Sequence, residues 1–282
     1  MVLRNFSKDD FTFKNEIGCG NMCHVMLAEH NDTKIDYAVK IINKAEILQR
    51  DVLHVVKTER AVLEKIDHKS IIKLEGTFQD PFNLYFVLEY APKGELFDRI
   101  VDDGPLSIDS AKFYLAELVN ALDYLKSKGI LHRDVKPGSE TLHIKLSDFN
   151  SAMFKPTESD SLSEEQKKVN GTVEFMSPES INRELASEAV DLWALGCTAY
   201  FLIDRGDSEY DTFNKILERE IEFPQDFDPN ARDLIEKLLK IDPKERLGMS
   251  ENGYLDIKTH PFFSGIDFDN IHDCTPPVMH NK

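Results

Sequence analysis

The sequence has few cysteines, no long apolar run and no excess of positive charge. Its four cysteines, Cys19, Cys23, Cys197 and Cys274, are too few among 282 residues for a dense disulfide framework, and we expect free thiols. No apolar run approaches the length of about 20 residues that a membrane-spanning helix needs. The first five residues contain no apolar stretch of the signal-peptide kind. These absences together predict a cytoplasmic protein.

Acidic residues outnumber basic ones by 51 to 34, which gives a formal net charge of −17. Nonspecific nucleic-acid binding depends on neutralising phosphates with Lys and Arg, so this balance argues against a nucleic-acid partner. It also gives no support for a polybasic membrane anchor, and we expect no membrane-binding domain in this chain. A length of 282 residues is enough for one large domain, or for two lobes, with a sizeable core.

The first third of the chain has the pattern of strands. Segments 11–13, 23–27 and 37–42 are rich in β-forming residues and are separated by glycine and Asn-Asp turns. A helix is predicted over 51–66, where apolar residues recur near one face. The short apolar run 84–88 is typical of a strand buried on both faces.

Beyond about residue 91 the chain has the pattern of helices. Ser107 can cap a helix with a continuous apolar stripe, and Gly129 can end it. Asp228 and Pro229 open another helix, which the Asp-Pro pair at 242–243 stops. A small β-rich part is therefore followed by a larger helical part.

Two glycines, Gly18 and Gly20, lie between predicted strands, where a glycine loop lets backbone N–H groups approach phosphates closely. Cys23 occupies the place of a third glycine. Lys40 follows on the next strand, and Glu59 on the predicted helix can pair with it. Taken singly, these features have ordinary interpretations: a turn, a surface lysine and a solvated glutamate. Their order along the chain is what favours a phosphate site.

The segment 132–137, His-Arg-Asp-Val-Lys-Pro, is the most specific signal and has the pattern of a protein kinase catalytic loop. The triplet 148–150, Asp-Phe-Asn, has the pattern of the metal-binding triplet that follows such a loop. Phosphoryl transfer needs a proton acceptor, a lysine near the transferred phosphate and ligands for Mg²⁺. Asp134, Lys136 and Asp148 can supply these three functions.

With these motifs the chain resembles a Ser/Thr protein kinase of the AGC group, most like the phosphoinositide-dependent kinases. The resemblance covers about residues 8–278. It implies an α+β, bilobal protein kinase fold with a small β-rich N-lobe and a larger helical C-lobe. The stretches that carry it, beside the motifs above, are 77–80, 84–86, 94–96, 191–197, 260–263 and 275–277. The domain expected from it covers 11–282, with an N-lobe of about 11–90, a C-lobe of about 91–268 and a C-terminal extension over 269–282.

The resemblance implies a signalling enzyme that transfers the γ-phosphate of ATP to protein hydroxyls, with ATP and Mg²⁺ as cofactors. Asp134 would accept the substrate proton, Lys136 would steady the γ-phosphate and Asp148 would hold Mg²⁺. Lys40 and Glu59 would form the pair that anchors the ATP phosphates. The residues expected to bind ATP are Ile17, Gly18, Gly20, Val25, Ala38, Lys40, Leu88, Glu89, Ala91 and Glu95.

The same resemblance implies structural contacts. Arg246 would pair with Glu179, Asp191 would brace the catalytic-loop backbone, and Thr172 would support the catalytic side chains.

The partners implied are protein substrates, among them other AGC kinases whose activation loops the enzyme would phosphorylate. These kinases would dock a phosphorylated hydrophobic segment at a pocket of the N-lobe. For the apolar members of this pocket, ordinary core packing is an equal alternative. The residues at matching positions are Lys44, Ile47, Leu48, Val56, Arg60, Gln79 and Leu84.

The chain departs from the family pattern inside the catalytic segment. Asp148 follows Asp134 by 14 positions, about four fewer than usual (148 − 134 = 14). Ser139 stands at the spacing of a metal-binding Asn, and we expect the short strand that follows it to be lost. Asn150 replaces a glycine, a change that the turn can tolerate.

Two further departures lie outside the catalytic loop. Lys168 occupies the place of the activation-segment phosphoacceptor, where it would meet Arg133. The segment after Gly206 is shortened, in a region that shapes substrate docking. Three interpretations follow: an active kinase, a catalytically impaired kinase fold that acts as a binding or scaffold module, or a gene model that lacks two coding segments.

Overall fold

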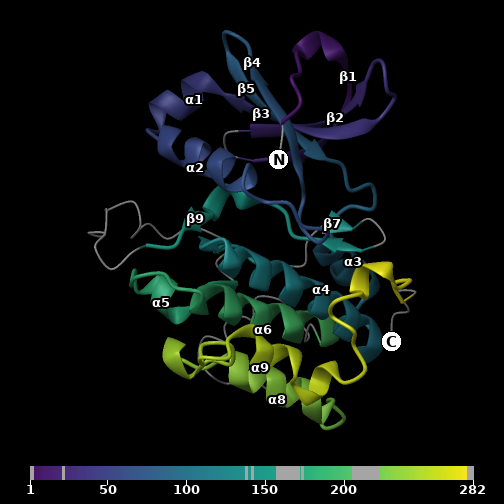
Figure 1. Cartoon of the computed structure of the whole chain (residues 1–282), viewed down its shortest axis with the longest axis vertical. Helices are drawn as coiled ribbons and strands as arrows, with labels where there is room; N and C mark the ends of the chain where they lie inside the picture. Colours follow the sequence, from purple (N-terminus) through teal and green to yellow (C-terminus); the bar gives the residue numbers. More distant parts are fainter. Residues whose placement is uncertain are drawn as a thin grey trace. The chain divides into compact units, whose positions relative to one another are not determined.

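The chain divides into two compact units, Met1–Pro92 and Lys93–Lys282. The computed structural model describes residues 3–20, 23–136, 139–140, 143–156, 172, 175–204, 221 and 223–277, and of 139–140 only the backbone. The first unit is built on a β-sheet with two helices, and the second is mainly helical (Figure 1). The α+β, bilobal fold predicted from the sequence is confirmed.

The first unit contains one antiparallel sheet of five strands in the order β1-β2-β3-β5-β4. Its strands are β1 (Phe11–Cys19), β2 (Cys23–His30), β3 (Asp36–Asn43), β4 (Leu74–Gln79) and β5 (Asn83–Glu89). Its helices are the 3₁₀ turn η1 (Lys8–Asp10), α1 (Lys44–Gln49) and α2 (Leu53–Leu63).

One face of this sheet holds an aromatic core. Tyr37 and Val39 of β3 alternate with residues of the other face, and Val39 lies opposite Val87 of β5. Both valines are fully buried. Phe11 joins the same cluster, with its ring perpendicular to that of Tyr37. The other face is therefore available for polar side chains.

The structure extends the predicted strands and adds elements that the sequence pattern did not predict. The helix predicted over 51–66 is α2, which begins at Leu53. The preceding helix α1 was missed because it has only six residues and no full apolar period. Its signal was Asn43, whose side chain accepts the backbone N–H groups of Ala45 and Glu46. The strand predicted over 84–88 is β5, with three consecutive buried residues.

The second unit is organised around two long helices, α4 and α6 (Figure 1). All 15 residues of α6 are buried, and this helix packs against α4 and α8. The helices are α3 (Leu96–Asp103), α4 (Ile108–Ser127), α5 (Pro178–Ile181), α6 (Ala189–Ile203), α8 (Pro229–Leu238) and α9 (Tyr254–Lys258). The 3₁₀ turns are η2 (Phe149–Ser151), η4 (Pro243–Glu245), η5 (Pro261–Phe263) and η6 (Ile271–Asp273).

The predicted helix ends of this unit are confirmed. The Ser107 hydroxyl accepts the N–H of Ser110 at the start of α4. Gly129 follows the helix with φ +64°, a conformation that favours glycine. The Asp228 carboxylate accepts the N–H of Ala231 (2.8 Å) at the start of α8.

The expectation that the shortened catalytic segment loses its strand is wrong. Strand β7 (Ser139–Glu140) pairs antiparallel with β8 (Ile144–Lys145). A second short pair joins β6 (Ile130–Leu131) to β9 (Met153–Phe154). The physical reason is that a two-residue pair needs few positions, so a shorter connection still closes the hairpin.

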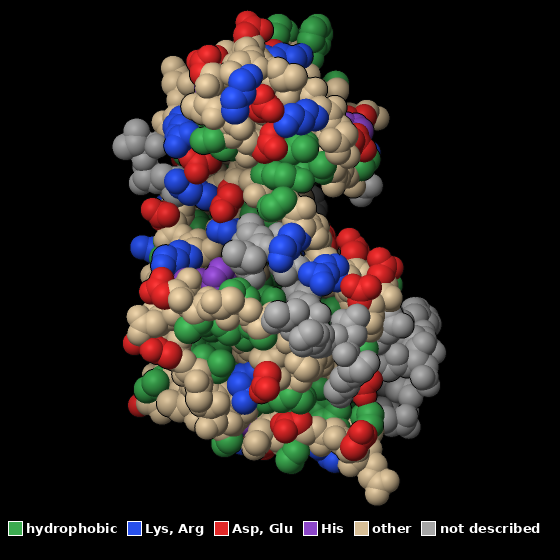
Figure 2. All heavy atoms as spheres, turned by 90° about the vertical axis from the view of Figure 1, so that its right-hand side faces the viewer, with side chains coloured by type: hydrophobic (Ala, Val, Ile, Leu, Met, Phe, Trp, Pro, Cys, Tyr) green, Lys and Arg blue, Asp and Glu red, His purple; other side chains and the backbone are tan. Residues whose placement is uncertain are grey.

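All four cysteines lie in the described part of the chain, and none of them forms a disulfide. Among the described residues, no helix combines the length and the hydropathy that a membrane span requires. Lys and Arg side chains are interspersed with Asp and Glu on the face shown in Figure 2.

Candidate active site

Strand register collects ATP-site candidates on one face of the sheet in the first unit. Val25 of β2 lies opposite Gly18 of β1 and also opposite Lys40 of β3. Two positions along β3, Ala38 lies opposite Leu88 of β5. Residues directly opposite in an antiparallel sheet share a face, and so do residues two positions apart. These five residues therefore lie on the same face of the sheet.

The predicted pair between Lys40 and Glu59 is present in the structure. The Lys40 ammonium donates to Glu59 Oε1 across 2.5 Å, and both residues are buried. Glu59 comes from α2, so the contact ties that helix to the sheet. A buried charge needs a partner, which explains why the two residues are buried together.

The remaining candidates of the first unit lie at the ends of strands. Ile17 is partly exposed, and the Gly20 N–H donates to the Cys23 carbonyl (2.9 Å). The Glu89 N–H donates to the Lys73 carbonyl (2.9 Å). Ala91 follows β5 in an irregular segment.

In the second unit, a side chain of α6 binds the backbone of the catalytic loop. The Asp191 carboxylate accepts the backbone N–H groups of His132 (2.9 Å) and Arg133 (2.8 Å). Burial raises the pKa of Asp191, and the two N–H bonds and the charge of Arg133 oppose that rise. The predicted bracing role of Asp191 is confirmed by this geometry.

His132 is a neutral ring in the interior of the second unit. The N–H of Asp134 donates to His132 Nδ1 (3.3 Å), so His132 Nε2 carries the proton that faces the Ser147 carbonyl (3.1 Å). Burial lowers the pKa of His132. The ring also meets Phe149 edge-on, with centroids 4.6 Å apart. The catalytic loop and the Asp-Phe-Asn triplet are thereby packed together.

Two hydrogen bonds orient the loop side chains. The backbone N–H of Thr172 donates to Asp134 Oδ1 (2.8 Å), which agrees with the supporting role predicted for Thr172. Arg133 Nε donates to the Ser151 carbonyl (2.6 Å). The sequence did not predict the Arg133 contact, because no motif spacing marks a backbone carbonyl as an acceptor.

Glu95 lies among charged side chains in this unit. Burial raises the pKa of Glu95, the charge of Lys136 opposes this rise, and the charges of Asp98, Asp148 and Asp134 add to it. Each of these groups is therefore within electrostatic reach of Glu95. The group is net negative, and carboxylate oxygens are the ligands that Mg²⁺ prefers. The residues present thus fit a divalent cation.

Asp148 has a left-handed backbone conformation, and one of its carboxylate oxygens accepts hydrogen bonds from Asn150. Its φ is +61°, in the left-handed region, and its Oδ1 accepts the N–H (3.4 Å) and the side-chain amide (2.5 Å) of Asn150. Asn150 therefore competes for one of the oxygens that a cation would use. The sequence signal for this contact was the replacement of glycine by an amide.

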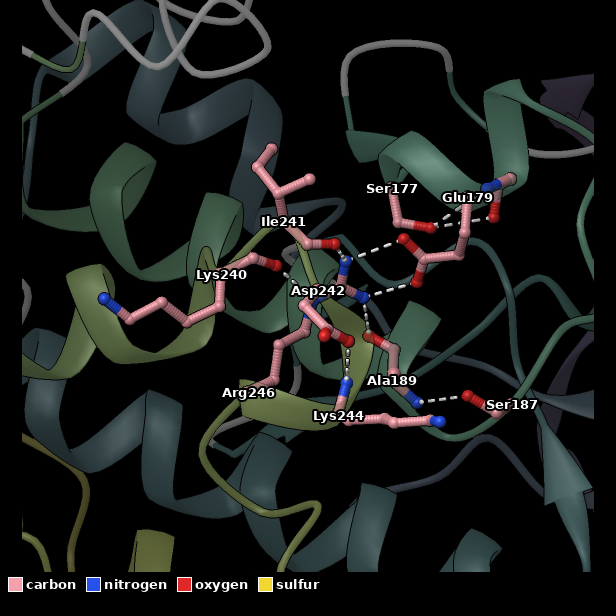
Figure 3. A network of polar contacts seen from close by, with 10 residues as sticks. Ser177, Glu179, Ser187, Ala189, Lys240, Ile241, Asp242, Lys244 and Arg246 are labelled. Carbon is pink, nitrogen blue, oxygen red and sulfur yellow. Dashed lines mark hydrogen bonds and ion pairs between the residues drawn. The ribbon is translucent and has the colours of Figure 1, made fainter.

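The predicted pair between Arg246 and Glu179 is the centre of a larger network (Figure 3). Arg246 Nη1 donates to Glu179 Oε1, and Nη2 donates to Oε2 (2.6 Å). The same guanidinium donates to the carbonyls of Ala189 (2.7 Å) and Lys240 (2.8 Å) and lies over the Trp193 ring. The predicted contact is confirmed. Because the Arg246 guanidinium already donates to a carboxylate and to backbone carbonyls, we interpret its role as structural.

Several predicted features lie outside the described residues. These are the side chain of Ser139, Pro137 of the catalytic loop, the activation-segment position Lys168 and the shortened segment after Gly206. The expected meeting of Lys168 with Arg133 thus stays a prediction.

Comparison with known proteins identifies relatives over nearly the whole chain. The protein kinase domain family matches residues 11–263. The 3-phosphoinositide-dependent protein kinase 1 of Arabidopsis thaliana is 41% identical over 98% of this chain and 59% of its own length. The protein of that name in Homo sapiens is 41% identical over 96% of this chain and 50% of its own length. Serine/threonine-protein kinase PKH2 of Saccharomyces cerevisiae is 36% identical over 96% of this chain. The chain spans about half the length of the first two relatives.

Proposed function

The chain belongs to the protein kinase family, and on that premise we propose that it transfers the γ-phosphate of ATP to Ser and Thr hydroxyls of proteins. Its resemblance to 3-phosphoinositide-dependent protein kinases favours activation loops of other AGC kinases as substrates. The predicted division into an N-lobe of about 11–90, a C-lobe of about 91–268 and an extension over 269–282 belongs to this proposal. We also propose that the enzyme works in the cytoplasm, since its cysteines form no disulfide.

The observation that carries the proposal is the charged group of the second unit. The Asp134 carboxylate, oriented by the Thr172 N–H, would accept the proton of the attacking hydroxyl. Lys136 would stabilise the negative charge that develops on the transferred phosphoryl group. A Thr172-oriented carboxylate loses little conformational freedom during the reaction, which favours catalysis.

The proposed cofactors are Mg²⁺ and ATP. Asp148 would hold Mg²⁺, whose charge neutralises the β- and γ-phosphate oxygens when it is bound. Lys40, positioned by Glu59, would pair with the ATP phosphates. The Gly18 and Gly20 backbone would approach those phosphates without a side chain in the way. The other ATP-site candidates would contact the nucleotide from β1, β2, β3 and the segment after β5.

Phosphate transfer from Mg-ATP to a peptide substrate tests the proposal directly. The intact chain is expected to transfer phosphate at a rate well above that of Asp148→Ala, which serves as the control. Equal rates in the two proteins would contradict the proposal and favour a binding or scaffold role. A thermal shift with ATP that requires Mg²⁺ then separates nucleotide binding from transfer.

We propose further that substrate kinases dock on the first unit near α1 and α2. Leu48 of α1 has 74% of its surface exposed, which suits an apolar contact, whereas Ile47 and Val56 are buried in the core. Lys44 donates to Gln79 Oε1 (3.0 Å), and Arg60 pairs with Glu64. Arg60 is exposed and Lys44 is half-buried, and both cations can exchange their partners for a phosphate.

A binding assay tests the docking proposal separately from catalysis. Arg60→Ala is expected to weaken binding of a phosphorylated hydrophobic-segment peptide, while Arg50→Ala, at an exposed position of the same region, is the matched control. Unchanged affinity in Arg60→Ala would show that this phosphate site is wrong.

A further inference from the structure

Three side chains with metal-ligating atoms meet on the β1–β2 hairpin of the first unit. The ligating atoms of Glu16, Cys19 and His24 all lie within 4.8 Å of one another. Glu16 Oε2 is 2.8 Å from His24 Nδ1, and Cys19 Sγ is 3.8 Å from the same nitrogen. All three residues are exposed, so an ion can reach them from solvent.

A strand irregularity brings the three side chains to one face. Cys19 lies directly opposite His24, and Glu16 lies opposite Met26, two positions from His24. In a regular strand, residues 16 and 19 would point to opposite faces because their separation is odd. The register shifts between Glu16 and Gly18, where two steps along β1 match one step along β2. This bulge adds one residue and returns Glu16 to the face of Cys19.

The spacing of the ligating atoms suits a tetrahedral ion. With zinc bonds of about 2.0–2.3 Å, neighbouring ligand atoms of a tetrahedral site lie about 3.3–3.8 Å apart. The 3.8 Å contact of Cys19 Sγ with His24 Nδ1 lies at the upper end of this range, and the 2.8 Å contact of Glu16 Oε2 with the same nitrogen lies below it. Small rotations of exposed side chains would therefore bring the atoms to coordination distance.

We propose that Glu16, Cys19 and His24 bind Zn²⁺ or a cation with the same ligand preference. Thiolate, imidazole and carboxylate are the three ligand types that zinc accepts in proteins. A thiolate favours zinc over Mg²⁺ and Ca²⁺, which prefer oxygen ligands. Water occupies the fourth position of such a site. The bound ion cross-links β1 to β2 next to Gly18 and Gly20.

A second group, Glu117, His143 and His272, also brings ligating atoms within 4.8 Å of one another. It contains no thiol, and its Glu117 carboxylate is fully buried and accepts the Ile144 N–H (3.0 Å). The two groups are therefore distinguishable by a signal that only a thiolate produces.

The test uses the full chain, freed of metal and reduced without a chelating thiol. Cobalt(II), a common substitute for zinc, is titrated while its thiolate-to-metal charge-transfer absorption is recorded, and zinc affinity is measured by calorimetry. The variants are Cys19→Ser and His24→Ala. The matched controls are Cys274→Ser, which removes an exposed cysteine elsewhere, and His272→Ala, which disables the second group.

The intact chain, Cys274→Ser and His272→Ala are expected to show the charge-transfer band, and Cys19→Ser is expected to lack it. Even outer partners of metal ligands contribute about 10–100-fold to affinity, so His24→Ala is expected to bind zinc at least about tenfold more weakly. A band that survives in Cys19→Ser would overturn the proposal. So would unchanged zinc affinity in both variants, or zinc binding that disappears only in His272→Ala. Circular dichroism of each variant checks that it is folded.

Discussion

The two units hold their candidate functional residues by different means. In the first unit, antiparallel strand pairing places Gly18, Val25 and Lys40 in one row across the sheet. In the second unit, the catalytic loop is irregular, and side chains from distant positions hold its backbone. Asp191, for example, binds two consecutive N–H groups that lie 58 and 59 positions earlier in the chain.

The difference has a physical origin in where the backbone hydrogen bonds go. A strand satisfies its N–H and C=O groups with its neighbours, so its side chains are available for function. A buried loop has no such ladder, and its polar groups need partners from side chains. Substitutions in the loop region are therefore expected to reduce stability, and substitutions on the sheet to reduce activity.

The largest expected effect is on the stability of the second unit. Arg246→Met is expected to lower the free energy of unfolding by about 3–5 kcal/mol, because the Glu179 carboxylate stays buried without its partner. Adding Glu179→Gln should restore only part of this loss, since the carbonyls of Ala189 and Lys240 still lack their donor. Urea unfolding of the full chain measures both values.

A surface pair provides the control for this prediction. Arg232 pairs with Glu236 on the exposed side of α8, and Arg232→Met is expected to change the unfolding free energy by less than about 1 kcal/mol. If Arg246→Met behaves like Arg232→Met, the buried network does not stabilise the second unit.

Neutralising the buried ion pair of the first unit, Lys40 with Glu59, is expected to reduce the rate of phosphate transfer. Lys40→Met with Glu59→Gln removes both charges of the pair, so no buried ion is left alone. Phosphate transfer is expected to fall about 10²–10³-fold, the usual effect of losing one positioned electrostatic group. Urea unfolding should show a smaller loss of stability than Arg246→Met with Glu179→Gln. An equal or larger loss would contradict the contrast between the two regions.

The third prediction concerns pH and the buried ring of the catalytic loop. Burial lowers the pKa of His132 below its ordinary value of 6.5, so between that lowered pKa and about pH 6.5 the unfolded chain binds up to one more proton than the folded chain. Stability should therefore fall with decreasing pH, by up to about 1.4 kcal/mol per pH unit from this residue. His132→Phe should remove this part of the slope, as measured by unfolding across pH. Parallel slopes in the two proteins would speak against a neutral buried His132.

The smallest expected effect concerns the cation at Asp148. Asn150→Gly removes the amide that donates to Asp148 Oδ1, so the magnesium concentration for half-maximal phosphate transfer should fall about two- to tenfold, the equivalent of one hydrogen bond. Asn270→Gly is the matched control, because Asn270 makes a similar contact with Asp267 on an exposed turn. A requirement for more magnesium in Asn150→Gly would contradict this interpretation.

Much of the fold could be predicted from the chain's local patterns. Helix α4 was recognised from its apolar stripe and from Ser107 and Gly129 at its ends, because such signals act over a few residues. Helix α1 was missed, since six residues carry too little periodicity. The loss of the strand at 139–140 was predicted wrongly, because counting positions does not show how few residues a strand pair needs.

By itself, the sequence determined the family, the order of the units and the residue types that phosphoryl transfer requires. These depend on motifs whose members lie close together in the chain. Only the tertiary structure decided that Arg133 binds the Ser151 carbonyl and that a bulge turns Glu16 toward Cys19 and His24. The reason is that backbone groups carry no sequence signal, and a one-residue shift in register reverses the face of every side chain beyond it.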